Sequence, residues 1–178
     1  MNSTQQKIYK LISVFLEYPE YEWMDGLPEL REEIASFENP IFRTYFEQFL
    51  NYLEYTPWEE VCEQYVNTFD YHGVVSLHLT FHVFKDSRER GEALVKLRQL
   101  FRESDVEMDT TEMPDYLPMV LEFLAIAEDE HVKRMLKLHL KSIIQLEKVL
   151  AKQDSPYSFL LKACIENSRY VLNEMHVS

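Results

Sequence analysis

Glycine, cysteine and proline are scarce in this chain, which has only 3, 2 and 7 of them in 178 residues. Hairpin-rich sheets draw on glycine and proline for their turns, whereas the abundant Leu, Glu, Lys, Gln and Met favour helices. The composition therefore predicts an all-α fold. With 46% hydrophobic residues, the chain can bury one well-covered core but is too short to expect two domains. We expect a single-domain helical bundle spanning residues 1–178.

The same scarcity excludes several kinds of site. The chain contains no Gly-x-Ser-x-Gly elbow, P-loop or dinucleotide fingerprint. Cys62 and Cys164 lie far apart and lack the paired spacing of zinc or redox motifs, so we interpret them as buried free thiols in a reducing compartment. Acid–base catalysis by scattered carboxylates stays open, but no motif supports it.

Basic residues are also few, 18 against 31 acidic ones, which gives a formal charge of −13. This charge repels nucleic acid phosphates and anionic lipid headgroups and favours a cationic partner. The longest stretch without Asp, Glu, Lys or Arg, Tyr71 to Phe84, is shorter than the roughly 20 residues of a membrane helix. The first residues show no secretory signal. We expect a cytoplasmic protein that neither binds nucleic acid nor spans a membrane.

Apolar residues at helical spacing predict about eight to nine helices. Asn39-Pro40 is typical of an N-cap and first helical residue, and Thr56 and Glu59 have the spacing of a capping box. Asp115 as an N-cap would place Pro118 at the third helical position, where its missing N–H costs nothing. The expected helices begin near Ser3, Leu30, Pro40, Thr56, Ser76, Ser87 (or Asp86), Asp115, Val132 and Ser155. The segment 129–131 is interpreted as a helix junction, and residues 72–73 as a helix end.

Two pairs of residues have the spacing of metal ligands. His78 and His82 would share a helical face and could bind a metal together, but a third ligand is missing. Glu128 and His131 have the Glu-x-x-His spacing of di-metal bundles, which need that pair twice and two further glutamates. We interpret the histidines as packed or capping residues. A small helical metalloprotein or enzyme using His78, His82 and Glu128 is the alternative.

A set of short strings, in a definite order, spans most of the chain: Leu16-Glu17-Tyr18-Pro19, Tyr65, Phe69-Asp70, Ser76-Leu77, His82-Val83, Ser87-Arg88-Glu89-Arg90-Gly91, Met113-Pro114-Asp115-Tyr116-Leu117-Pro118 and Leu121-Glu122. In these strings the chain resembles the NarJ type of respiratory nitrate reductase assembly chaperone, within the TorD/DmsD-like helical molybdoenzyme chaperones. The likeness weakens after about Lys133. The family's Pro-Asp-His is here Pro114-Asp115-Tyr116, so a group that titrates near neutrality is missing.

The resemblance implies a non-catalytic chaperone that binds the N-terminal, leader-like segment of the nitrate reductase catalytic (alpha) subunit. It implies that the chaperone assists insertion of the molybdenum bis(guanine dinucleotide) cofactor and an iron–sulfur cluster before membrane docking. No cofactor would be bound permanently, and molybdenum cofactor biosynthesis proteins are further candidate partners. An adaptor for some other basic helix is a second alternative.

A basic amphipathic leader helix needs apolar cover for one face and carboxylates for its charges. Aromatic side chains beside acidic loops can supply both. We therefore expect the peptide-binding residues to be Tyr65, Phe69, Asp70, Leu77, Glu112, Pro114, Asp115, Tyr116, Val120 and Glu122.

Two arginines fall in the first turn of a predicted helix, where the helix dipole favours anions. Arg88 and Arg90 should therefore have specific anionic partners. One interpretation is that they bind Glu112, Asp115 or helix carbonyls and fix two loops. The other is that they contact an anionic part of the client or the cofactor pyrophosphate.

Overall fold

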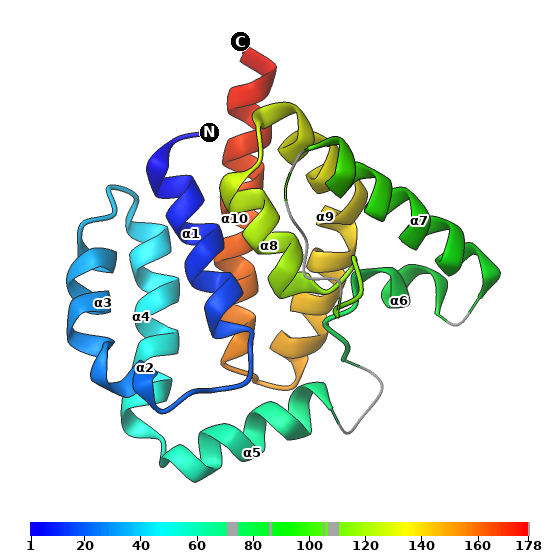
Figure 1. Cartoon of the computed structure of the whole chain (residues 1–178). Coiled ribbons are helices and arrows are strands. Elements are labelled where there is room, and N and C mark those ends of the chain that lie inside the picture. The colour runs from blue at the N-terminus through cyan, green and yellow to red at the C-terminus, as the bar shows by residue number, and fades with distance from the viewer. Residues whose placement is uncertain (71–74, 86, 105, 107–110, 178) are drawn as a thin grey trace.

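The computed structural model describes residues 1–70, 75–85, 87–104, 106 and 111–177. Within these residues the chain forms ten helices and no strand (Figure 1). They are α1 (Ser3–Phe15), α2 (Glu22–Asp25), α3 (Leu27–Ala35), α4 (Pro40–Tyr55), α5 (Trp58–Phe69), α6 (Leu79–Phe84), α7 (Arg88–Glu103), α8 (Leu117–Ile126), α9 (Asp129–Lys152) and α10 (Tyr157–Val177). The all-α prediction is confirmed, and the number of helices is close to that expected.

The centre of the fold is the packing of α1 against α8 and α10, with α4 and α9 also against α10 (Figure 1). Ile8 and Ile12 of α1 have no exposed surface. Among the polar side chains of the core, the Ser13 hydroxyl donates to the Pro118 carbonyl at 3.0 Å and joins α1 to α8. The bundle therefore gives a rigid frame to the loops at its ends, because its apolar interior is closely packed.

Two predicted helix starts have different outcomes. The Asn39 side chain accepts a hydrogen bond from the Ile41 amide at 3.0 Å, which confirms it as the N-cap of α4. The Thr56 capping box is wrong, because the N-cap of α5 is Pro57 and no side chain caps that helix. The Thr56 amide instead donates to the Tyr52 carbonyl at 3.1 Å and so completes the end of α4. Only two residues separate α4 from α5, so the amide that donates to α4 cannot also donate to a side chain in a capping box of α5.

The segment before α6 is extended rather than helical. Leu79 N donates to Asp115 O at 3.0 Å and Leu117 N donates to Leu77 O at 2.8 Å, around an antiparallel bridge between His78 and Tyr116. Pairing with the residues before α8 thus delays the helix from Ser76, where it was predicted, to Leu79. The predicted cap Asp86 and the predicted helix end at residues 72–73 lie outside the described residues.

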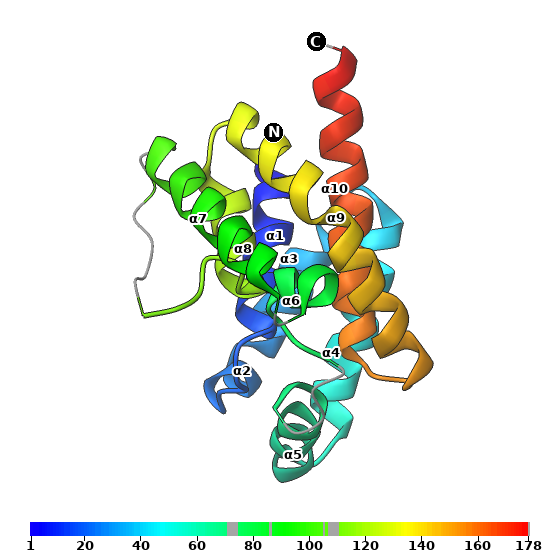
Figure 2. The same ribbon diagram turned by 90° about the vertical axis from the view of Figure 1, so that its right-hand side faces the viewer.

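The start of α9 also differs from prediction, because residues 129–131 form its first turn and not a junction. Across one end of the bundle runs α5, held by rings: Tyr157 of α10 lies 5.9 Å from Tyr65 and 5.0 Å from Phe69 between centroids (Figure 1). Helices α6 and α7 lie together on one side of the bundle, and α6 packs against α9 (Figure 2). None of the helices described is both long enough and apolar enough to cross a bilayer.

Candidate functional site

Asp115 lies at the centre of the loops that precede α6 and α8. Its side chain has no exposed surface and accepts hydrogen bonds from the Thr80 amide, at 3.0 Å, and from the Thr80 hydroxyl. The Arg90 guanidinium is 3.8 Å from the same oxygen, and His78 Nδ1 is 3.4 Å from the other. Burial alone would raise the pKa of Asp115, but the interactions with His78 and Thr80 outweigh it and hold the pKa below its usual range.

This arrangement corrects the predicted N-cap. The residue in the N-cap position of α8 is Tyr116, so Pro118 is at the second helical position and not the third. Asp115 is not the cap because its carboxylate is turned toward Thr80 and Arg90, where a buried charge is better compensated. Asp115 therefore belongs to a structural ion pair with Arg90, although the sequence predicted it as the N-cap of a helix.

The two arginines have different environments. Arg90 binds Thr80 Oγ1 at 3.1 Å and lies beside Asp115, which supports the interpretation that it fixes the loops. The side chain of Arg88 is 93% exposed and its nearest carboxylate, at 4.0 Å, is Glu92 on the same helix. The predicted loop-fixing contact is therefore wrong for Arg88, because the first turn of α7 points this side chain into solvent.

Aromatic side chains from three distant segments meet at the end of the bundle covered by α5. The ring of Tyr65 lies 5.0 Å from that of Phe69 and 5.5 Å from that of Tyr18, between centroids. The Tyr116 hydroxyl donates to Glu17 Oε2 at 3.1 Å, and its own pKa is raised by burial and by the nearby Tyr65 and Glu17. We call these five residues, Glu17, Tyr18, Tyr65, Phe69 and Tyr116, the Tyr65–Tyr116 surface.

Carboxylates surround this surface. Burial raises the pKa of Glu17, and the neighbouring carboxylates of Glu112, Glu122 and Glu20 raise it further. Asp70 is exposed, and its negative charge contributes to raising the pKa of Tyr65. Of these groups, Glu122 also forms an ion pair with Lys10. The surface thus combines apolar rings with a strongly negative rim, which attracts a cationic ligand.

The structure brings most of the predicted peptide-binding residues to this region but gives them different roles. Phe69, Tyr116 and the exposed acids Asp70, Glu112 and Glu122 belong to the surface or its rim. Tyr65 is itself only 5% exposed and is the buried centre on which the rings of Tyr18 and Phe69 pack. The others, Leu77, Pro114, Asp115 and Val120, are also buried, so in this conformation they do not present their side chains to a ligand.

Sequence reasoning missed two members of the surface, Glu17 and Tyr18. The signal was present, because both lie in the string Leu16-Glu17-Tyr18-Pro19 that carries part of the resemblance. Tyr18 is 52% exposed although it sits against Tyr65. A large ring that is held in place yet open to solvent is the kind of anchor that peptide-binding surfaces use.

The residues considered for metal binding are not arranged for it. His78 precedes α6 with an extended backbone, so it does not share a helical face with His82. The His82 ring binds the Ser76 carbonyl at 2.6 Å, as a packed histidine does. In the part of the chain that the structure describes, no three His, Cys, Asp or Glu side chains are grouped to hold a metal ion. The metalloprotein alternative gains no support.

The fold and the site define an all-helical, acidic protein with an aromatic surface edged by carboxylates. The comparisons with known proteins define the class further. Residues 38–162 match the family model described as nitrate reductase delta subunit. The chain therefore belongs to this family.

Proteins similar to this chain include named chaperones and a nitrate reductase-like protein. Over 94% of its length the chain is 34% identical to the probable nitrate reductase molybdenum cofactor assembly chaperone NarJ of Bacillus subtilis (strain 168), of which it covers 93%. It is 30% identical over 84% of its length to the chaperone NarJ of Escherichia coli (strain K12), covering 64% of that protein. Nitrate reductase-like protein NarX of Mycobacterium tuberculosis (strain ATCC 25618 / H37Rv) is 31% identical over 88% of this chain, which covers 23% of NarX. The predicted resemblance to NarJ-type, non-enzymatic chaperones is confirmed.

Proposed function

We propose that this protein is an assembly chaperone for a respiratory nitrate reductase and binds the N-terminal, leader-like segment of the apo catalytic subunit at the Tyr65–Tyr116 surface. The observation that carries the proposal is the aromatic surface with its acidic rim, in a chain of net charge −13. Membership of the nitrate reductase delta subunit family supports nitrate reductase as the client.

The two components of the surface would act on different steps of binding. Rings of Tyr18 and Phe69, which pack on the buried Tyr65, would cover the apolar face of the leader helix, and this burial would set the lifetime of the complex. Carboxylates such as Glu17 and Glu112 would attract the basic residues of the leader and speed the encounter. A leader with both features would be selected over a merely apolar or merely basic segment.

Binding the leader would delay membrane docking of the catalytic subunit. The apo-subunit would then stay open to insertion of the molybdenum bis(guanine dinucleotide) cofactor and an iron–sulfur cluster, with molybdenum cofactor biosynthesis proteins as further partners. The chaperone would hold neither group permanently and would act in the cytoplasm. In this function the protein makes and breaks no covalent bond.

Calorimetry with a synthetic peptide from the N-terminus of the cognate catalytic subunit tests the proposal. We expect micromolar or tighter binding, with a negative heat-capacity change from apolar burial and with weaker binding at high salt. The double variant Glu17→Gln/Glu112→Gln should weaken binding about tenfold at low salt and make it less salt-dependent.

The matched control is Glu128→Gln/Glu130→Gln, which removes two exposed carboxylates at the start of α9, away from the end of the bundle that α5 covers (Figure 1). This variant has the same charge change but should bind the leader peptide like the parent protein. A peptide that does not bind, or that loses the same affinity in both double variants, would count against the Tyr65–Tyr116 surface as the leader site.

A further inference from the structure

Positive charge is concentrated on two helices of this acidic protein. Helices α7 and α9 together carry eleven of the 18 Lys and Arg side chains, five on α7 and six on α9, against three acidic side chains each. Their combined net charge is +5. Because the whole chain has a net charge of −13, the residues outside these two helices have a net charge of −18. The two parts of the molecule therefore suit partners of opposite charge.

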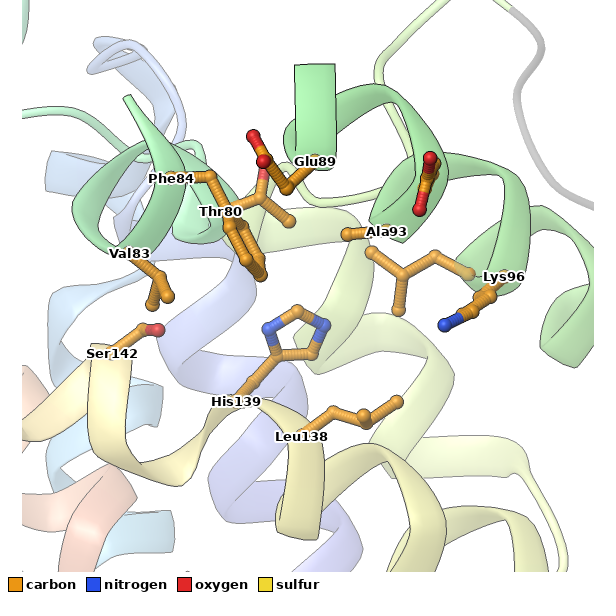
Figure 3. A pocket seen from close by; sticks show the side chains of 11 residues that line it. Thr80, Val83, Phe84, Glu89, Ala93, Lys96, Leu138, His139 and Ser142 are labelled. Atoms are coloured by element: carbon orange, nitrogen blue, oxygen red, sulfur yellow. The ribbon is translucent and has the colours of Figure 1, made fainter. Parts of the chain in front are cut away.

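A pocket lies between α6 and the two basic helices α7 and α9 (Figure 3). Its volume is about 310 Å³, far more than the roughly 30 Å³ share of one water molecule in the liquid. Its apolar lining consists of Val83, Phe84, Ala93, Leu97 and Leu138, and Glu89 and Glu92 also line it, so the carboxylates of a partner would lie beyond this pocket. A pocket of this size and lining suits a large apolar side chain from a partner.

A second hollow of about 380 Å³ adjoins the pocket along α7 and α9. Lys96 and Leu138 line both, and the second hollow adds Leu100, Arg134 and Lys137. We call the two hollows together the α7–α9 groove. Its lining on α7 runs from Glu89 to Leu100, about 16 Å along the helix axis, which is the length of three helical turns. An elongated apolar groove of this length suits a helix better than a compact ligand.

A buried histidine at the wall of the pocket lacks a partner. Figure 3 shows the ring of His139 between α9 and the side chains of α6 and α7, and only 5% of this residue is exposed. Its Nε2 atom has no hydrogen-bond partner among the described residues. Burial lowers the pKa of His139 to about 4, so the ring is neutral near pH 7. A neutral ring at the wall of the pocket is compatible with an apolar side chain beside it.

We propose that the α7–α9 groove binds an acidic amphipathic helix of a partner protein, with an apolar side chain in the pocket and carboxylates against Lys96 and Lys137. Both lysines are exposed, and neither forms an ion pair within the residues that the structure describes. Arg134 at the edge of the groove is held by Glu103 at 2.8 Å and would add to the positive field. The groove shares no residue with the Tyr65–Tyr116 surface, so this inference does not depend on the proposed leader site.

Fluorescence anisotropy with a designed helical peptide tests this inference. The probe is a labelled peptide of about 15 residues, made of Glu, Ala and Leu with Leu at helical spacing, and its partner probe has Lys in place of every Glu. We expect the Glu peptide to bind and the Lys peptide not to bind at the groove. The variant Lys96→Glu/Lys137→Glu should weaken the Glu peptide about tenfold or more, and Leu138→Ser should also weaken it.

The matched control is Lys148→Glu/Lys152→Glu, which makes the same charge change near the other end of α9, on residues that do not line the groove. It should leave binding of the Glu peptide within about twofold of the parent value. Equal losses in the two double variants, or no binding of the Glu peptide, would overturn the proposal. Leader-peptide calorimetry on the groove variant should show unchanged affinity, so failure here is distinct from failure of the proposed function.

Two other occupants give different results in the same assay. If a nucleoside triphosphate such as GTP displaced the Glu peptide at much lower concentration than the peptide itself, the groove would be a site for a small anion. If sedimentation showed a dimer that Lys96→Glu/Lys137→Glu dissolves, the occupant would be a second copy of this chain. Either result would overturn the proposed helical partner.

Discussion

Asp115 holds together three elements that are distant in the sequence. Its carboxylate accepts from the Thr80 amide at 3.0 Å and lies 3.8 Å from Arg90, while its carbonyl accepts from the Leu79 amide at 3.0 Å. These contacts join α6 and α7 to the segment before α8. Removing a buried charged side chain costs much stability, because its former partners are then left buried without a compensating charge or hydrogen bond.

The variant Asp115→Ala should therefore lower the free energy of unfolding by about 3 kcal/mol, measured by urea denaturation at neutral pH. The control is Glu112→Ala, which removes an exposed carboxylate three residues away and should change stability by no more than about 0.5 kcal/mol. Similar losses in the two variants would show that the Asp115 network does not stabilise the fold.

The pH dependence of this effect has a defined sign. The pKa of Asp115 is lower in the folded protein than in the unfolded chain, so the folded state holds fewer protons. The stabilisation is complete above the ordinary aspartate pKa of about 4 and is lost as the pH falls through the folded value. Asp115→Asn should flatten the decline in stability below about pH 4, and an unchanged decline would contradict the assignment.

At the scale of single residues, the sequence predicted partners better than positions. Arg90 was expected to have an anionic partner, because an arginine in a first helical turn opposes the dipole, and Asp115 was among the partners considered. The N-cap role of Asp115 was wrong because local spacing does not show that Thr80 competes for the carboxylate. Val120 was placed on the surface although it is fully buried, since one helical stripe does not tell core from groove.

Among the elements, helix termini give the most direct test of the N-cap rules used to predict helix starts. Asn39 caps α4 through a hydrogen bond of 3.0 Å, whereas Thr56 has the right spacing but the N-cap of α5 is Pro57, without a side-chain cap. Asn39→Ala should therefore cost about 1 kcal/mol of stability, and Thr56→Ala should stay within about 0.5 kcal/mol. Thermal or urea unfolding of the two variants under one set of conditions measures the difference. A larger loss for Thr56→Ala would show that its hydroxyl caps α5 in solution.

Elements with a long apolar stripe could be predicted from the sequence, because burial against the core decides both their existence and their face. The stripe of α1 is an example: Ile8 and Ile12 are wholly buried. The four residues of α2 are too few to show a period. The extended segment before α6 could not be predicted, because its pairing with Tyr116 is a contact between residues far apart in the chain.

For the whole molecule, the formal charge of −13 conceals a division into an acidic part and the basic pair α7 and α9. The total favours a cationic partner and gives no sign of a surface for an anionic one. The candidate leader site was partly predictable, because Tyr65, Phe69 and Tyr116 lie in strings that carry the resemblance. Glu17 was missed because only the folded chain brings it to Tyr116, at 3.1 Å.

The central claim, that this protein enables nitrate reductase to receive its molybdenum cofactor, is tested most directly by the metal content of the client. The measurement is the molybdenum content of the catalytic subunit purified from cells with and without this chain. We expect subunit from cells lacking it to be made but to contain little molybdenum, and re-expression of the parent protein to restore the metal. Full molybdenum content and full nitrate reductase activity in the cells that lack the chain would contradict the claim.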